Sequence, residues 1–436
     1  MRLRPYRLEW LLLALVALAT LPLVSIETAQ DSSRLAVTQS IVERGKLDID
    51  PYWQQTIDRG FAHGHWYSDK APGVSLVAVP VVAAIRAVDG GGKPIWLRPW
   101  QVWLLRVWTG GLALLALTFL VGRVAEGLVA GTGAVTAATL AVGTMAGSLG
   151  ATVFGHLPDA LVLFAALIVG SRARRARDWV WVGLLAGVGV LFEYPAALAA
   201  LVLLIYAALK GGRRAAAWVI AGVVPPALVL GAYDWLAFGA PWRLSYRYTS
   251  NVFTPYQTQD FFGVGLPSGH GIWTLLFDGH GLLLVSPVLL AAIPGLVFFR
   301  RRWRLEAGVA IAIALLFAIY TAGYFLPNGG TSPGPRFAAA ALPFLLLGLP
   351  YALERRRLIT IALVACSVGL ALFDELTWSV ANRLEFLAWP KTVWSLLGLS
   401  SEAGCIVLLA CGAAAGLLAV APVAARPRAL LPSAKP

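Results

Sequence analysis

The chain has 436 residues, of which 58% are hydrophobic and only 13% are charged. A soluble domain carries about 25% charged residues, so this composition excludes an ordinary soluble protein and predicts a membrane protein. The net charge of +13 does not indicate nucleic-acid binding, because the arginines gather in short clusters between apolar runs.

Apolar runs long enough to form membrane helices recur along the whole chain. A bilayer core requires about 20 consecutive apolar residues per helix. The candidate spans are 9–26, 99–122, 133–153, 157–170, 179–192, 194–209, 215–237, 279–299, 305–323, 337–353, 357–374 and 403–422. The sequence therefore predicts an all-α polytopic transmembrane bundle of about twelve spans.

The arginine clusters predict the orientation of this bundle. They fall in alternate gaps between the spans, which places them on one side of the membrane. The positive-inside rule makes that side cytoplasmic, with both termini on it. We then expect loops 27–98, 154–156, 238–278, 324–336 and 375–402, and a short turn at Glu193, to face outward. The long outer loops indicate that the function lies on this face.

The first outer loop, 27–98, contains predicted interfacial helices. Residues 32–44 have the pattern of a short amphipathic helix, which Gly45 would end. Residues 48–64 predict irregular structure. Pro72 and Gly73 then begin an apolar helix over 74–88, which is too short to span a bilayer. We expect one membrane domain over 1–422 and a disordered cytoplasmic tail over 423–436.

Five short motifs fall on the predicted outer face, each of them weak alone. In chain order they are Gln30-Asp31-Ser32-Ser33-Arg34, Asp69-Lys70-Ala71-Pro72-Gly73, His156-Leu157-Pro158-Asp159, Phe261-Phe262-Gly263-Val264 with a segment that includes Ser286-Pro287, and Gly334-Pro335-Arg336-Phe337. Their order and shared placement resemble the GT-C-type integral-membrane glycosyltransferases, the superfamily of protein O-mannosyltransferases and bacterial aminoarabinose transferases. The resemblance spans most of the chain.

This resemblance implies a glycosyltransferase with a polyprenyl-phosphate-linked hexose or pentose as donor. It also implies an extracytoplasmic acceptor, which is a cell-envelope glycan, a lipid or a protein, and inversion at the anomeric carbon. Membrane lipids are expected partners and nucleic acid is not. Several relatives carry two acids in the first motif, whereas here Gln30 precedes Asp31. No cofactor is therefore assigned, and dependence on a divalent metal stays open.

Transfer from a phosphate requires one base and neighbouring cations, because a phosphate leaves far more readily than an alkoxide. We predict Asp31 as the base that takes the proton of the acceptor hydroxyl. The alternative is that Asp31 caps the helix at 32–44. Lys70 and Arg336 are predicted to bind the donor phosphate, and Arg247 is a weaker candidate. The alternatives are headgroup contact for Lys70 and an ordinary interface position for Arg336.

Six further polar residues are candidates for substrate binding. His156 and Asp159 stand three residues apart, which places them on one helix face, although both suit a polar helix end. Glu193 interrupts an apolar stretch, and a short outer turn is the alternative explanation. The full set is Arg34, Asp69, His156, Asp159, Glu193 and His280.

Two other functions compete with sugar transfer. A lipid-linked glycan transporter or flippase requires a polar path through the middle of its helices, and few charges occupy such positions. A structural scaffold would tolerate the loss of Asp31 and Lys70.

Overall fold

The computed structural model describes residues 1–22, 28–90, 94–95, 98–278, 280–330, 332–380 and 401–424. It is mostly helical, with 74% helix. The helices of eight or more residues are α1 (Glu9–Thr20), α2 (Ala29–Arg44), α3 (Gly73–Asp89), α4 (Pro99–Arg106), α5 (Leu112–Leu128), α6 (Gly133–Val142), α8 (His156–Arg172), α9 (Val180–Phe192), α10 (Ala196–Phe238), α12 (Gly269–Leu276), α14 (Leu289–Arg302), α15 (Arg304–Gly323), α18 (Arg357–Val380) and α20 (Ser401–Ala424).

Shorter elements connect these helices. The four- to seven-residue α-helices are α7 (Ala146–Gly150), α11 (Thr254–Gln257), α13 (Leu282–Val285), α16 (Leu342–Leu345) and α17 (Leu349–Arg355). The 3₁₀-helices are η1 (Trp53–Gln55), η4 (Ala176–Trp179), η5 (Ser245–Tyr248), η6 (Arg336–Ala341) and η7 (Leu346–Gly348), and η3 (Val107–Gly111) is a π-helix between α4 and α5. Two strands, β1 (Arg59–Ala62) and β2 (His65–Ser68), form an antiparallel hairpin.

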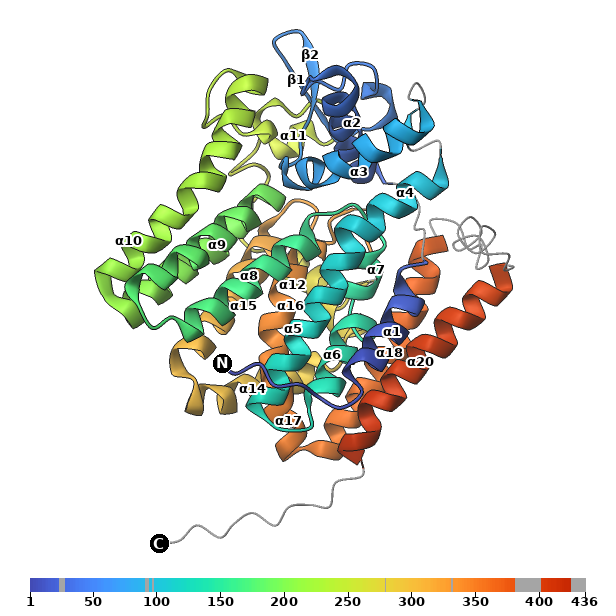
Figure 1. The fold of residues 1–436 in the computed structure, drawn as a ribbon, viewed down its shortest axis with the longest axis vertical. Helices are drawn as coiled ribbons and strands as arrows, with labels where there is room; N and C mark the ends of the chain where they lie inside the picture. The colour runs from blue at the N-terminus through green and yellow to red at the C-terminus, as the bar shows by residue number, and fades with distance from the viewer. Residues whose placement is uncertain are drawn as a thin grey trace, which may run out of the picture.

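The elements divide into a helical bundle and a cap at one end of it (Figure 1). The cap consists of α2, the β1–β2 hairpin and α3, together with η5 and α11, which follow α10. Helices α1, α18 and α20 pack together on one side of the bundle, and α9 and α10 form the other side. The cap therefore rests on the ends of helices that come from both halves of the sequence.

The bundle is that of a membrane protein, although the expected count of about twelve spans is not shown. In the described part of the chain, five helices are long and apolar enough to cross a bilayer: Trp100–Leu128, Ala196–Phe238, Arg304–Gly323, Arg336–Arg355 and Arg357–Glu375. Shorter apolar helices occupy Glu9–Thr20, Gly133–Val142 and Ile406–Ala421. Helix α10 merges two expected spans, with a break at Gly212, where φ is 74° and ψ is −173°. The expected span 133–153 is instead split between α6 and α7.

The cap agrees with the predicted helices of the first loop and adds a hairpin. Helix α2 ends where Gly45 adopts a left-handed conformation with φ of 63°, and α3 begins at Gly73. The expectation of irregular structure over 48–64 is wrong at its end. There His63 and Gly64, with φ of 52° and 85°, form the two-residue turn between β1 and β2. The tail that was expected to be disordered falls, from residue 425 onward, outside the described residues.

Candidate functional site

A buried cation lies where β2 joins α3. The Lys70 Nζ atom is 3.1 Å from Asp58 Oδ2 and 3.1 Å from Asp69 Oδ1. The backbone N–H of Lys70 donates to the Ser68 hydroxyl, which lies 2.6 Å from the hydroxyl of Ser33 in α2. Lys70 is 8% exposed and Asp69 is fully buried. The hairpin and α2 together hold this ammonium group in one place.

The charged groups at this junction shift one another's pKa values. Burial raises the pKa of Asp69 to about 6, although the neighbouring Lys70 opposes the shift. Burial alone would lower the pKa of Lys70, but the carboxylates of Asp58 and Asp69 more than offset it and raise that pKa above its ordinary value. Lys70 therefore stays positive at neutral pH, whereas Asp69, with a pKa of about 6, takes up a proton slightly below neutral pH.

The glycine of the Asp-Lys-Ala-Pro-Gly motif lets the first turn of α3 sit against the end of α9. A Cβ atom on Gly73 would lie only 2.5 Å from the backbone oxygen of Leu191. Any larger residue would therefore push α3 away from the turn at Glu193. The motif thus places Lys70 beside the α9–α10 connection.

A buried ion pair ties three segments together under this junction. The Arg34 guanidinium lies 2.5 Å from Glu193 Oε1, and both side chains are almost fully buried. The same oxygen accepts the N–H of Gly155 at 3.1 Å and lies 3.8 Å from Nδ1 of His156. Glu193 follows α9 directly, as the sequence predicted for a short turn. The pair therefore links α2, the start of α8 and the α9–α10 turn.

Several polar atoms around this pair are buried without a hydrogen-bond partner among the described residues. Native proteins pair most buried polar groups, so a concentration of such atoms indicates a place for a polar ligand. The ionisable atoms concerned are Nε and Nη1 of Arg34, Oδ1 and Oδ2 of Asp69, Nε2 of His156, Oδ1 of Asp159 and Nε of Arg336. Of these, Asp69 Oδ1 makes the ion pair with Lys70.

Arg336 approaches the same place from the other half of the chain. It opens η6 and is half-buried, with its guanidinium 5.3 Å from the ring centre of Phe154 and 5.4 Å from that of Phe337. The ring of His156 packs edge-on against the same two aromatic rings, at 5.9 and 5.5 Å. Arg336 also adds a positive charge that acts on Lys70. Two cations from distant motifs therefore belong to one cluster.

Asp31 is placed differently from the predicted base. Its side chain is fully buried and takes part in the capping box of α2, where Oδ2 accepts the N–H of Thr28 at 3.1 Å. Its Oδ1 accepts the N–H of Val153 at 2.8 Å, and Oδ2 lies 3.3 Å from Arg106 Nη2. The N-cap of α2 is Thr28 and Asp31 is the third residue of the helix, so Asp31 supports the helix start from a different position than the expected cap. These contacts favour a structural role, because two backbone N–H groups and Arg106 already contact the carboxylate.

Two predicted residues stand apart from the cluster. Arg247 lies in η5 with an exposed side chain, although its neighbour Ser245 donates a hydrogen bond to the backbone oxygen of Asp69. His280 forms an ion pair with Asp374 of α18 through a side chain that is about half exposed. The structure thus brings together Arg34, Asp69, Lys70, His156, Asp159, Glu193 and Arg336, and leaves Arg247 and His280 outside.

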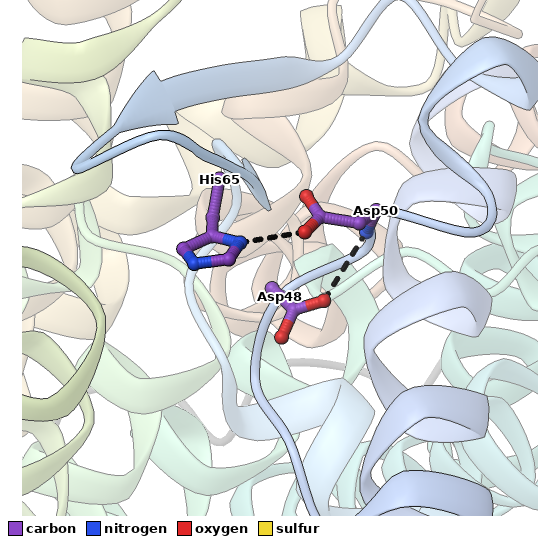
Figure 2. A group of neighbouring side chains, drawn as sticks. All are labelled: Asp48, Asp50 and His65. Carbon is purple, nitrogen blue, oxygen red and sulfur yellow. Dashed lines mark hydrogen bonds and ion pairs between the residues drawn. The ribbon is translucent and has the colours of Figure 1, made fainter.

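One group of metal-ligating side chains occurs among the described residues, and Figure 2 shows it. His65 Nδ1 lies 2.6 Å from Asp50 Oδ2, and Asp50 Oδ1 accepts the N–H of Trp66 at 2.7 Å. Asp48 Oδ1 pairs with Arg44 at 2.7 Å. Protein donors therefore already serve both carboxylates, and the group shares no residue with the cluster around Lys70. It gives no support to a metal in that cluster.

An apolar groove of about 310 Å³ begins beside the polar cluster. It runs between α3, η3, α5 and α8; two of its lining residues directly adjoin members of the cluster in sequence, and a third adjoins the glycine of the motif that contains Lys70. Val74 follows Gly73, Phe192 precedes Glu193, and Pro158 precedes Asp159. The complete lining is Val74, Val77, Trp108, Thr109, Leu112, Ala113, Ala116, Pro158, Leu161, Val162 and Phe192. An amphiphile with a long apolar chain and a charged head fits this arrangement.

Several contributors were missed in the sequence. Asp58 lies in the segment expected to be irregular, and no motif or spacing marks it. Arg106 stands 75 positions from Asp31, so its ion pair has no local signal. Ser33 and Ser68 are common polar residues whose contact depends on the hairpin. Only a correct prediction of the hairpin at 59–68 would have placed Ser68 and Asp58 beside Lys70.

Comparisons with known proteins show structural similarity only. No protein-family model and no curated protein matches the chain. The similar solved structures include ArnT from Cupriavidus metallidurans in the apo state, at 16% identity and a TM-score of 0.49, covering 95% of this chain and 72% of ArnT. The same protein bound to undecaprenyl phosphate gives 17% identity and a TM-score of 0.48, covering 94% of this chain and 76% of ArnT.

An archaeal oligosaccharyltransferase, AglB from Archaeoglobus fulgidus, is similar as well. Its complex with an inhibitory peptide and a dolichol-phosphate gives 13% identity and a TM-score of 0.47, covering 96% of this chain and 55% of AglB. The likeness to these two proteins, at 13% to 17% identity, concerns the fold alone.

Proposed function

We propose that this chain is a membrane glycosyltransferase that moves a sugar from a polyprenyl-phosphate donor to an acceptor on the outer side of the membrane. The observation that carries the proposal is the pair of cations, Lys70 and Arg336, beside buried polar atoms at the start of an apolar groove. The donor sugar is a hexose or a pentose. The acceptor is a cell-envelope glycan, a lipid or a protein.

The donor phosphate binds between Lys70 and Arg336. Ionised donors make hydrogen bonds to phosphate that are about twice as strong as neutral ones. Lys70 is positioned by Asp58 and Asp69, and Arg336 is held over two aromatic rings. The polyprenyl chain follows the apolar groove between α3, α5 and α8. The head and the chain of one lipid then occupy the two adjoining regions.

Asp69, rather than Asp31, takes the proton of the acceptor hydroxyl. A general base works best when its pKa lies near the operating pH, and burial raises the pKa of Asp69 to about 6. No described hydrogen-bond donor other than the Lys70 ammonium approaches its carboxylate oxygens. Proton uptake by Asp31 would instead disturb a helix cap and its contact with Arg106.

The transfer is a single displacement that inverts the anomeric carbon. The acceptor oxygen forms a bond to that carbon, and its proton passes to Asp69. The bond from carbon to phosphate oxygen breaks through an oxocarbenium-like state, as in glycoside hydrolysis. The charge that develops on the leaving phosphate is met by Lys70 and Arg336. His156, Asp159, Arg34 and Glu193 orient the sugar hydroxyls.

A radiolabelled transfer assay tests this function. Purified protein in lipid nanodiscs is incubated with polyprenyl-phosphate sugars and an envelope extract, and both labelled product and free polyprenyl phosphate are measured. We expect both to appear together. Lys70→Gln should lower the initial rate about a hundredfold, which corresponds to the loss of about 2.7 kcal/mol. The matched control is Lys46→Gln, which removes an exposed lysine of the same loop.

The alternative is a transporter or flippase for lipid-linked glycans. Such a protein would move the intact donor across a membrane and would release no polyprenyl phosphate. Movement of labelled donor in proteoliposomes with no sugar transfer to any acceptor would replace our proposal with this function. Equal transfer rates for the Lys70 and Lys46 variants would show that Lys70 does not bind the donor phosphate.

A further inference from the structure

A second hollow lies where α14 turns into α15. This turn stands at the part of the bundle far from the β1–β2 hairpin (Figure 1). It has a volume of about 500 Å³. Its lining consists of Arg300 from α14 and of Arg304, Leu305, Gly308, Ile311, Ala312 and Leu315 from α15. None of these residues belongs to the site around Lys70, so the hollow is a separate feature of the molecule.

The lining residues of α15 form one continuous strip. Positions 304, 308, 311 and 315 recur every three or four residues, which places them along one face of the helix. The strip spans about 16 Å at the rise of an α-helix. Leu305 is 39% exposed and Leu315 is 57% exposed, although α15 is one of the five helices apolar enough to cross a bilayer. This face therefore meets lipid tails.

The head of the strip is positively charged. Arg300 and Arg304 are both exposed, and the lining includes no carboxylate. The one acid in the first turn of α15, Glu306, is committed elsewhere: its Oε1 lies 2.8 Å from Lys210 Nζ and accepts a 2.7 Å hydrogen bond from Tyr206. The amino end of α15 adds its partial positive charge at Arg304. Two guanidinium groups therefore stand over an apolar channel.

We propose that this hollow binds one anionic phospholipid. Arg300 and Arg304 hold its phosphate, and an acyl chain runs along the strip from Gly308 to Leu315. The argument is charge complementarity combined with an apolar channel that begins at the charged head. Basic pockets between membrane helices are suited to anionic headgroups, and guanidinium groups match phosphate oxygens in pairs. A zwitterionic lipid lacks the net charge that this site selects.

Gly308 offers a way to block the channel without straining the protein. A Cβ atom on Gly308 would meet no protein atom within 4 Å. A leucine at this position therefore projects into the space assigned to the acyl chain. Gly308→Leu and Arg300→Gln/Arg304→Gln test the channel and the head independently, so a folding failure of one leaves the other informative.

Native mass spectrometry of the purified full chain tests the proposal. The protein is titrated with phosphatidylglycerol and, separately, with phosphatidylcholine of the same acyl chains. We expect one tightly bound phosphatidylglycerol, with at least about tenfold preference over phosphatidylcholine. Arg300→Gln/Arg304→Gln and Gly308→Leu should each weaken that binding about tenfold. The matched control is Arg174→Gln/Arg177→Gln, which removes two exposed arginines elsewhere and should retain the bound lipid.

Three results would overturn the proposal. The first is equal affinity for the two lipids. The second is unchanged lipid binding in both the arginine pair variant and the Gly308 variant. The third is displacement of the lipid by millimolar inorganic phosphate alone, because the acyl chain would then contribute nothing.

Discussion

The first turn of α2 and the β2–α3 junction each bury an aspartate, yet they treat it in opposite ways. The carboxylate of Asp31 accepts hydrogen bonds from two backbone N–H groups and faces Arg106. Within the described part of the chain, the carboxylate of Asp69 meets no hydrogen-bond donor other than the ammonium of Lys70. Several hydrogen bonds make the first aspartate part of the framework. Sparse contacts, with a pKa raised by burial, leave the second able to accept a proton.

Replacing Asp69 should produce the largest effect on transfer. Asp69→Asn keeps the size of the side chain but removes the base, and general-base catalysis contributes about 10²–10⁴-fold. We expect the initial rate per folded molecule to fall about a thousandfold, with only a small change of unfolding temperature because Asp58 still pairs with Lys70. The radiolabelled transfer assay and thermal unfolding measure the two quantities. Near-normal turnover by this variant would show that a residue other than Asp69 is the base.

Replacing Asp31 should instead destabilise the protein. Asp31→Asn leaves Arg106 buried beside a neutral partner, and breaking a buried ion pair costs about 3–5 kcal/mol. Part of the stability should return in Asp31→Asn/Arg106→Met, because the buried guanidinium that the carboxylate balanced is then replaced by an apolar side chain. Denaturant unfolding of the two single variants and the double variant measures this coupling. A large loss of transfer per folded molecule, with stability unchanged, would show that Asp31 acts as the base after all.

Gly73 should tolerate no side chain. In Gly73→Ala the new Cβ atom would approach Leu191 O to 2.5 Å, so the start of α3 must move. Overpacking of this kind costs about 1–3 kcal/mol, and displacement of Lys70 should lower transfer about tenfold. Gly45→Ala is a control for glycine removal, because a Cβ there would meet nothing although its positive φ adds strain. Equal transfer rates per folded protein in the two variants would show that Gly73 does not position Lys70 for transfer.

Transfer should depend on pH through Asp69. The base acts when it is ionised, and its pKa is raised to about 6, so activity is present above this pH. Below pH 6 the protonated fraction grows, and the rate should fall about tenfold per unit. The initial rate between pH 4.5 and 8, with unfolding followed in parallel, checks the slope. A flat profile down to pH 5 in folded protein would exclude this group.

Arg247 should show the smallest effect. Its side chain is exposed in η5 and lies outside the cluster around Lys70. We expect Arg247→Gln to change transfer by less than about threefold, as exposed charges contribute little. A loss as large as that of Lys70→Gln would mean that the loop around η5 closes over the donor.

Short sequence patterns correctly predicted those helix ends and turns that depend on a few neighbouring residues. Gly45 ended α2, Pro72 and Gly73 opened α3, His156 opened α8 and Glu193 formed a turn, each as expected. The hairpin at 59–68 was not predicted, and with it the place of Asp58 beside Lys70. Only a fold brings Arg34 within 2.5 Å of Glu193, because the two are 159 positions apart. Sequence spacing alone therefore predicted candidate site residues but not the residues that contact them.

The membrane spans were predictable in part. The gap between the spans expected at 194–209 and 215–237 matches the break at Gly212, whereas hydropathy does not register the division of 337–353 among η6, α16, η7 and α17. Apolar composition persists through 337–353, whereas regular α-helical geometry does not. The membrane character of the chain was predictable, while the number of about twelve crossings stays a prediction.

Binding of polyprenyl phosphate itself tests the central claim most directly, because it requires neither the sugar nor the acceptor. Its affinity for the wild-type protein, for Lys70→Gln and for Lys46→Gln is measured by titration in nanodiscs. The phosphate site predicts an affinity at least about tenfold weaker in Lys70→Gln and an unchanged affinity in Lys46→Gln. Equal affinity in all three proteins would contradict it.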